Sequence, residues 1–75
     1  MSRLRPTRAR EVIRFLASLG FVQVRQKGSH KFFRHRDGRT ATVPDHKGED
    51  FGRGILAKIL RDAGVKPSEF LAWLS

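Results

Sequence analysis

The sequence predicts an α+β fold in which helices cover one face of a three-stranded antiparallel sheet. Apolar residues recur at helical spacing near both ends of the chain, apolar and polar residues alternate in its middle, and turn residues separate these segments. The expected order is helix, strand, strand, strand, helix and a short last helix. No repeat or linker divides the chain, so we expect a single domain over residues 1–75, with a flexible arm at residues 1–6.

The first helix is expected directly after Pro6, with Thr7 as its N-terminal cap. From Val12 onward, apolar residues recur at i, i+4 and i+7, which gives the helix one apolar face. Gly20 follows the last of these positions. We expect it to end the helix, because glycine readily adopts the left-handed backbone conformation found there.

Three strands are expected over residues 21–26, 30–36 and 39–44. In the first strand, simple alternation of side chains places Val22 and Val24 on one face and the residues beside them on the other face. The third is rich in β-branched residues, which favour strands.

Turn residues join these strands into a meander. Gly28-Ser29 follows the first strand, and Asp37-Gly38, a strong hairpin signal, follows the second.

Residues five apart on a regular strand point to opposite faces, so His30 and His35 are not expected to act as one catalytic pair.

Two helices are expected after a polar loop over residues 45–50. Ile55 and Ile59 belong to the apolar face of the first helix, which is expected to end at Gly64. Pro67-Ser68 opens the short last helix, because proline is favoured at the first helical position.

The positive charge is concentrated in the first half of the chain. Sixteen Lys and Arg against seven Asp and Glu give a net charge of +9. Residues 1–39 carry this whole excess, whereas basic and acidic residues balance over residues 40–75. Such a concentration is typical of a surface that binds phosphate, so RNA is an expected partner; a solvated basic face without a ligand is the alternative.

The composition excludes several classes of protein. Without cysteine, the chain can form neither a disulfide framework nor a zinc site built on thiolates. No apolar run approaches the ~18 residues of a membrane helix, so we expect a soluble, cytoplasmic protein. The histidines lack the i, i+4 spacing of common zinc motifs, so neither a metal site nor a cofactor is expected.

His30 is the main candidate for a catalytic residue. An imidazole titrates near about 6.5 and can act as base or acid at physiological pH. The basic residues near it along the predicted ribbon, all candidates for binding RNA, are Arg25, Lys27, Lys31 and Arg34. Arg53, beside the start of the later helix, is a further candidate for binding phosphate.

Three elements occur in a characteristic order: Lys27-Gly28-Ser29-His30, then Thr42-Val43-Pro44-Asp45-His46, then a helix led by Gly54. With them the chain resembles, over residues 7–70, the HicA family, the small toxins of HicA–HicB toxin–antitoxin modules. The resemblance implies a fold like the double-stranded-RNA-binding domain, mRNA-cleaving ribonuclease (mRNA interferase) activity, and a HicB-type antitoxin through which the toxin would form oligomers.

The family's catalytic histidine maps onto His30, with Gly28 and Ser29 as supporting residues. Family members often have Gly-Thr where this chain has Gly54-Ile55, a departure that could alter a helix cap or an RNA contact.

The expected chemistry is attack of an RNA 2′-OH on its own phosphate, which leaves a 2′,3′-cyclic phosphate and a 5′-OH. His30 would remove the proton, and Lys27, Lys31 or Arg25 would offset the developing charge. The sequence identifies no acid for the leaving group. Phe32 and Phe33 should face oppositely, and one of them could stack on a base.

Other functions remain open on the sequence alone. A non-catalytic RNA-binding module of the same fold would show the same charge pattern and the same meander. A protein whose basic face docks an acidic partner is a second alternative. A DNA-binding regulator is less well supported, because no helix-turn-helix spacing is evident.

Overall fold

The structure, a computed structural model, describes residues 7–46 and 50–75, so the arm expected at residues 1–6 lies outside the described residues. The elements are β1 (Thr7–Arg8), α1 (Ala9–Ser18), β2 (Val22–Lys27), β3 (His30–Arg34), β4 (Thr40–Pro44), β5 (Asp50–Phe51), α2 (Arg53–Asp62) and α3 (Pro67–Leu74). The three predicted strands are observed with ends shifted by at most two residues, and Pro67 occupies the first turn of α3 as predicted.

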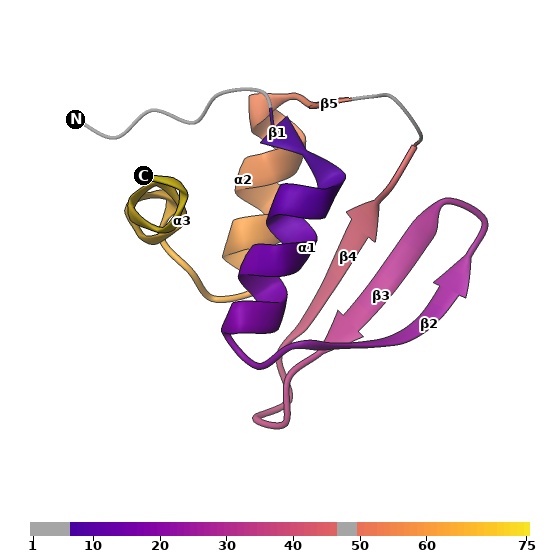
Figure 1. Cartoon of the computed structure of the whole chain (residues 1–75). Coiled ribbons are helices and arrows are strands. Elements are labelled where there is room, and N and C mark those ends of the chain that lie inside the picture. Colours follow the sequence, from indigo (N-terminus) through magenta and orange to yellow (C-terminus); the bar gives the residue numbers. More distant parts are fainter. Residues whose placement is uncertain (1–6, 47–49) are drawn as a thin grey trace.

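The architecture confirms the predicted fold class. The strands form an antiparallel sheet in the order β2-β3-β4, and α1 and α2 contact it chiefly through β4. In Figure 1, β4 is the strand nearest to α1 and α2, and α3 lies on the side of these helices away from the sheet. The resemblance implied a fold like that of the double-stranded-RNA-binding domain. The observed order of one helix, three strands and a second helix agrees with that fold.

Two faces of the sheet have different surroundings. Phe33, Ala41 and Val43 are buried on one face, where they join the core. The helical side chains in this core include Val12, Phe15, Leu16, Leu56, Ile59 and Leu60. Apolar burial of this kind is the main favourable contribution to folding, so this face holds the sheet against the helices.

The start of α1 differs from the prediction. Arg8 occupies the N-cap position, and its side chain makes no capping hydrogen bond. Thr7, predicted as the cap, is buried in β1 and pairs with Phe51 of β5. No local pattern indicates this pairing, because each strand has only two residues and the two strands lie far apart in the chain.

Glycine ends both long helices, as predicted. The N–H of Gly20 donates to the Ala17 carbonyl and that of Phe21 to the Leu16 carbonyl, each at 3.0 Å. This is a Schellman motif, and the φ of +102° at Gly20 is the left-handed conformation that the motif needs. The same pattern of bonds recurs at Gly64.

β2 carries a bulge that the alternation did not predict. Gln23 pairs with Phe33 but Arg25 pairs with Phe32, so Val24 is an extra residue between them. The bulge resets the alternation, and Val22 therefore shares a face with Arg25, three residues further along the chain. The prediction that Arg25 lies on the face opposite Val22 is wrong for this reason.

The turn between β3 and β4 is attached to the ends of both helices. His35 Nε2 donates to the Leu19 carbonyl at the end of α1 (3.0 Å), and its ring packs edge-on against Phe21. Arg39 donates to the Ala63 carbonyl at the end of α2 (2.6 Å). Histidine and arginine here satisfy carbonyls that a helix end leaves without an internal partner.

We predict that His35→Ala lowers the free energy of unfolding by about 1–3 kcal/mol, because the substitution leaves a helix-end carbonyl unpaired and removes a ring contact. Urea denaturation monitored by circular dichroism measures this change. His30→Ala, at an exposed position, should change the same quantity by less than about 0.5 kcal/mol. Equal losses for the two variants would contradict the structural role of His35.

Asp37 stabilises the same turn as an ionised carboxylate. Its Oδ1 accepts the backbone N–H of Arg39 (3.0 Å), and its Oδ2 lies 2.8 Å from Arg39 Nε. The backbone hydrogen bond is the largest cause of a lowered pKa for Asp37, followed among the lowering causes by the Arg39 side chain. A lowered folded-state pKa means that the carboxylate stabilises the fold above the unfolded-state pKa of about 4 and loses this effect as the pH falls through the folded-state value.

We therefore predict that Asp37→Asn destabilises the protein at pH 7 and that this difference shrinks as the pH falls through the lowered folded-state pKa of Asp37, where the wild-type carboxyl also becomes protonated. Urea denaturation of both proteins across this pH range gives the difference. A difference that stays constant with pH would show that the charge of Asp37 is not what stabilises the turn.

Candidate functional site

His30 is the first residue of β3 and follows a tight turn. Lys27 and His30 pair across the β2–β3 hairpin, with Gly28-Ser29 as the two-residue loop. Gly28 has φ +59°, which fits the first central position of a type II′ turn, where glycine is favoured. The Asp45 N–H donates to the Ser29 carbonyl at 2.7 Å and attaches this turn to the chain that leaves β4.

Strand pairing places three rows of residues on the sheet face that His30 occupies. Directly paired residues point to the same side of a sheet. The rows are Lys27–His30–Pro44, Arg25–Phe32–Thr42 and Val22–Arg34–Thr40. We call this surface the His30 face. It carries three of the predicted RNA-binding cations and no acidic side chain in these rows, so its field favours an anionic ligand.

Two predicted cations stand apart from His30. Lys31 lies on the opposite face, where its Nζ forms an ion pair with Asp45 Oδ2 at 2.6 Å. Arg53 is exposed in the first turn of α2 and does not line the hollows beside His30. The structure therefore brings Arg25, Lys27 and Arg34 to the site, but not Lys31 or Arg53.

His46 is the residue of the site that sequence reasoning missed. Its ring is inclined by 77° to that of His30, with 6.2 Å between the ring centroids. Its Nε2 is 3.5 Å from Ser29 Oγ, at the outer limit of a hydrogen bond. Counting from the predicted two-residue Asp37-Gly38 turn would have placed His46 opposite Ser29, next to His30, because antiparallel strands pair symmetrically about their turn.

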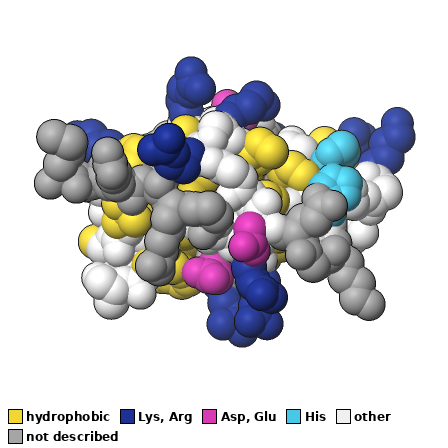
Figure 2. All heavy atoms as spheres, turned by 90° about the horizontal axis from the view of Figure 1, so that it is seen from above, with side chains coloured by type: hydrophobic (Ala, Val, Ile, Leu, Met, Phe, Trp, Pro, Cys, Tyr) yellow, Lys and Arg dark blue, Asp and Glu magenta, His cyan; other side chains and the backbone are white. Residues whose placement is uncertain are grey.

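Two hollows flank His30, and they share His30, Pro44 and Ile55. The first, of about 250 Å³, is also lined by His46, Asp50 and Phe51. The second, of about 360 Å³, is also lined by Phe32, Thr42, Lys58 and Ile59. Figure 2 shows histidine side chains together at one end of the molecule, next to hydrophobic side chains and near Lys and Arg. Ile55, at the position where family members often have threonine, thus borders both hollows.

His35 does not contribute to this site. Its Nε2 donates to a carbonyl, as described above, and its Nδ1 lies 3.1 Å from the Asp37 backbone N–H. With both ring nitrogens engaged and the side chain 16% exposed, His35 has no nitrogen directed at a substrate. The predicted separation of His30 and His35 is confirmed.

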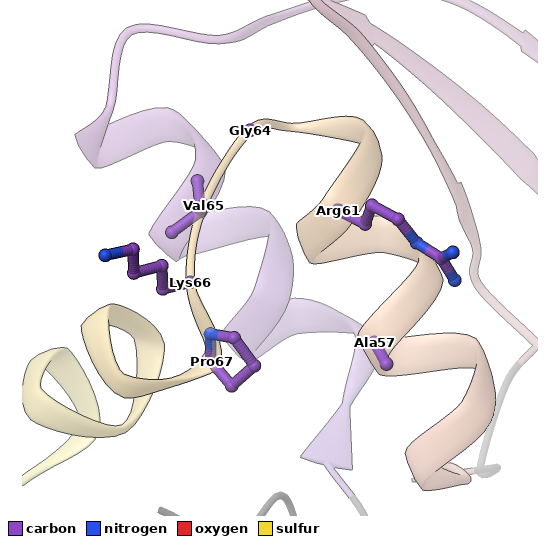
Figure 3. Close-up of a pocket in the computed structure, with 6 residues that line it drawn as sticks. All are labelled: Ala57, Arg61, Gly64, Val65, Lys66 and Pro67. Carbon is purple, nitrogen blue, oxygen red and sulfur yellow. The ribbon is translucent and has the colours of Figure 1, made fainter.

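A third hollow, of about 470 Å³, lies between α2 and α3 and is lined by Ala57, Arg61, Gly64, Val65, Lys66 and Pro67. In Figure 3 the side chains of Arg61 and Lys66 point away from each other, so they do not converge on one anion. The lining includes no group that could act as a base near neutral pH. The hollows beside His30 therefore remain the better candidate for chemistry.

Within residues 7–46 and 50–75, no group of three or more His, Cys, Asp or Glu is arranged to hold a metal ion. In the same part of the chain, no helix has the length and apolar character needed to cross a membrane.

A family model described as HicA toxin of bacterial toxin–antitoxin matches residues 9–65, which is most of the chain and includes β2, β3, β4 and α2. The match includes His30, His46 and all the residues that line the two hollows beside His30. No curated protein matches the chain at a significant level.

Proposed function

The chain belongs to the HicA family of toxins from bacterial toxin–antitoxin modules, and we propose that it is an endoribonuclease that cleaves mRNA without a metal ion. The observation that supports this most directly is the pair His30 and His46, whose ring centroids are 6.2 Å apart on the border of one hollow. Two imidazoles beside a cationic surface supply both a base and an acid for phosphodiester cleavage.

His30 acts as the general base in this proposal. It takes the proton of the ribose 2′-OH, whose oxygen then forms a bond to the adjacent phosphorus. The bond between phosphorus and the 5′ oxygen of the next nucleotide breaks, leaving a 2′,3′-cyclic phosphate. Because the nucleophile is the 2′-OH, RNA is cleaved and DNA is not.

His46 supplies the acid that the sequence left unassigned. The departing 5′ oxygen needs a proton, and it leaves on the side of the phosphorus opposite the attacking oxygen. A base and an acid for this reaction must therefore stand apart, and the two rings do. Ser29 lies within reach of His46 Nε2 and supports its position.

The charge that develops on the phosphate oxygens is offset by cations of the His30 face. Lys27 pairs directly across from His30, and Arg25 lies in the next row. Preorganised positive groups of this kind stabilise a transition state more than a ground state when the negative charge grows during reaction. Lys31 is left out of this role because Asp45 already neutralises it.

A HicB-type antitoxin is the proposed partner, and it would neutralise the toxin by covering the His30 face in the cytoplasm. Arg25, Lys27 and Arg34 are exposed on that face. An acidic protein surface would complement them and would exclude RNA by competing for the same charges.

We predict that the purified protein cleaves single-stranded RNA in EDTA and that His30→Gln lowers the rate by at least about 100-fold, because a general base is lost. Cleavage is followed on labelled RNA, and mapping of the ends should find 2′,3′-cyclic phosphate and 5′-OH. The matched control, His35→Gln, should cleave at the wild-type rate below its melting temperature. RNA binding without any cleavage by the wild type would instead indicate a non-catalytic RNA-binding module.

A second prediction separates the acid from the base. His46→Ala should lower cleavage of an ordinary RNA by at least about 100-fold, because the leaving alkoxide is no longer protonated. On uridine 3′-(p-nitrophenyl phosphate), whose leaving group needs no proton, His46→Ala should react near the wild-type rate while His30→Gln stays slow. If His46→Ala is equally impaired on both substrates, His46 is not the acid.

A further inference from the structure

We propose that the hollow between Phe32 and α2 is a subsite for one unpaired nucleobase next to the cleaved phosphate. The proposal rests on the proposed ribonuclease function and adds to it the part of the substrate that the protein recognises. It makes single-stranded RNA the substrate, although the fold resembles that of domains that bind duplex RNA.

The walls of this hollow fit a flat aromatic ligand. The Phe32 ring forms part of the sheet side, and the buried side chain of Ile59 lies on the helix side. Aromatic side chains that carry a partly exposed face are the usual stacking surface for bases of single-stranded nucleic acid. A volume of about 360 Å³ is within the range of pockets that hold small organic groups.

Arg25 makes a cation–π contact with the Phe32 ring. Its guanidinium carbon lies 4.5 Å from the ring centroid. Arg25 belongs to β2, whereas the residues that line the hollow come from β3, β4 and α2. Phe32 therefore lies between Arg25, which can bind a phosphate of the RNA backbone, and the hollow, which can hold a base.

Polar groups at this hollow can bind the remaining parts of a nucleotide. The Thr42 hydroxyl, which can donate and accept, lines it next to Phe32 and can meet the hydrogen-bonding edge of a base. Lys58 is exposed at the border, with its Nζ 3.6 Å from Asp62, and can reach a phosphate.

The position of His30 connects this subsite to the chemistry. His30 and Phe32 lie on the same face of β3 two residues apart, which is about 7 Å along a strand. A base beside Phe32 thus places its own ribose and phosphate near His30, and His30 lines both this hollow and the one that contains His46. A base in such a hollow has left any duplex stack, so the subsite requires unpaired RNA.

The test compares wild type and Phe32→Leu on a short single-stranded oligoribonucleotide with one cleaved bond, and on the same RNA with an abasic nucleotide on either side of that bond. Loss of the ring should lower kcat/KM by about 5- to 100-fold, the range expected for one base stacked on one aromatic ring. One of the abasic substitutions should lower kcat/KM of the wild type by a similar factor and have no further effect on Phe32→Leu. Annealing a complementary strand should suppress cleavage by the wild type.

Two other variants test base recognition and control for folding, respectively. Thr42→Val removes the hydroxyl at nearly constant shape and should change the preference for the base at the affected position. Trp73→Leu makes a matching aromatic substitution in α3, on the other side of the helices from the sheet, and should cleave like the wild type (Figure 1).

The outcomes distinguish this proposal from the ribonuclease proposal. If the wild type cleaves RNA but neither Phe32→Leu nor an abasic nucleotide changes kcat/KM, the subsite is overturned while the ribonuclease stands. If the wild type cleaves nothing, binding of an RNA that carries 2-aminopurine decides. Quenching of 2-aminopurine by the wild type but not by Phe32→Leu would support the subsite in a binding protein, and equal fluorescence with both would overturn it.

Discussion

Burial of Phe33, Ala41 and Val43 against the helices is the constraint on which the site depends. Because side chains alternate along a strand, burying these residues places His30 and Phe32 on the opposite face. A slip of one residue in β3 would turn His30, Phe32 and Arg34 toward the core, and burying the charged Arg34 without a partner would be costly. The core thus specifies the face of the sheet on which His30, the proposed catalytic base, lies.

Five basic residues of the strands and their turns serve two different roles, and the total charge does not reveal this difference. Arg39 and Lys31 have partners within the fold, a helix-end carbonyl and a carboxylate. Arg25, Lys27 and Arg34 project from the exposed side of the sheet in the rows that contain His30. The concentration of charge in residues 1–39 therefore overstates the binding surface, since part of that charge stabilises the turn and the junction between strands and helices.

Local sequence patterns predicted most of the fold, but of the two neighbouring histidines they singled out His30 and not His46. Gly20 and Gly64 were predictable because a helix end demands a left-handed conformation from one residue, and the opposite placement of His30 and His35 follows from strand geometry alone. The β1–β5 pairing and the bulge at Val24 depend on contacts between distant segments or on a local register shift, which alternation cannot show. The position of His46 follows from the same geometry, since its distance from the predicted Asp37-Gly38 turn mirrors that of Ser29, but this holds only when the two strands are paired with each other.

The exposure of β2 explains why its cationic side chains contribute to the proposed site with little effect on the stability of the fold. Every residue of β2 is exposed, including Val22 at 63% and Val24 at 57%, so none of them belongs to the core. An exposed edge strand is a liability, because its free backbone groups can pair with another chain, and a bulge with flanking cations is a common protection. Arg25 and Lys27 protect the edge in this way and face the same side as His30. The features that keep β2 from pairing with other chains therefore also form the cationic side of the proposed RNA site, and substituting them would change binding without disturbing the core.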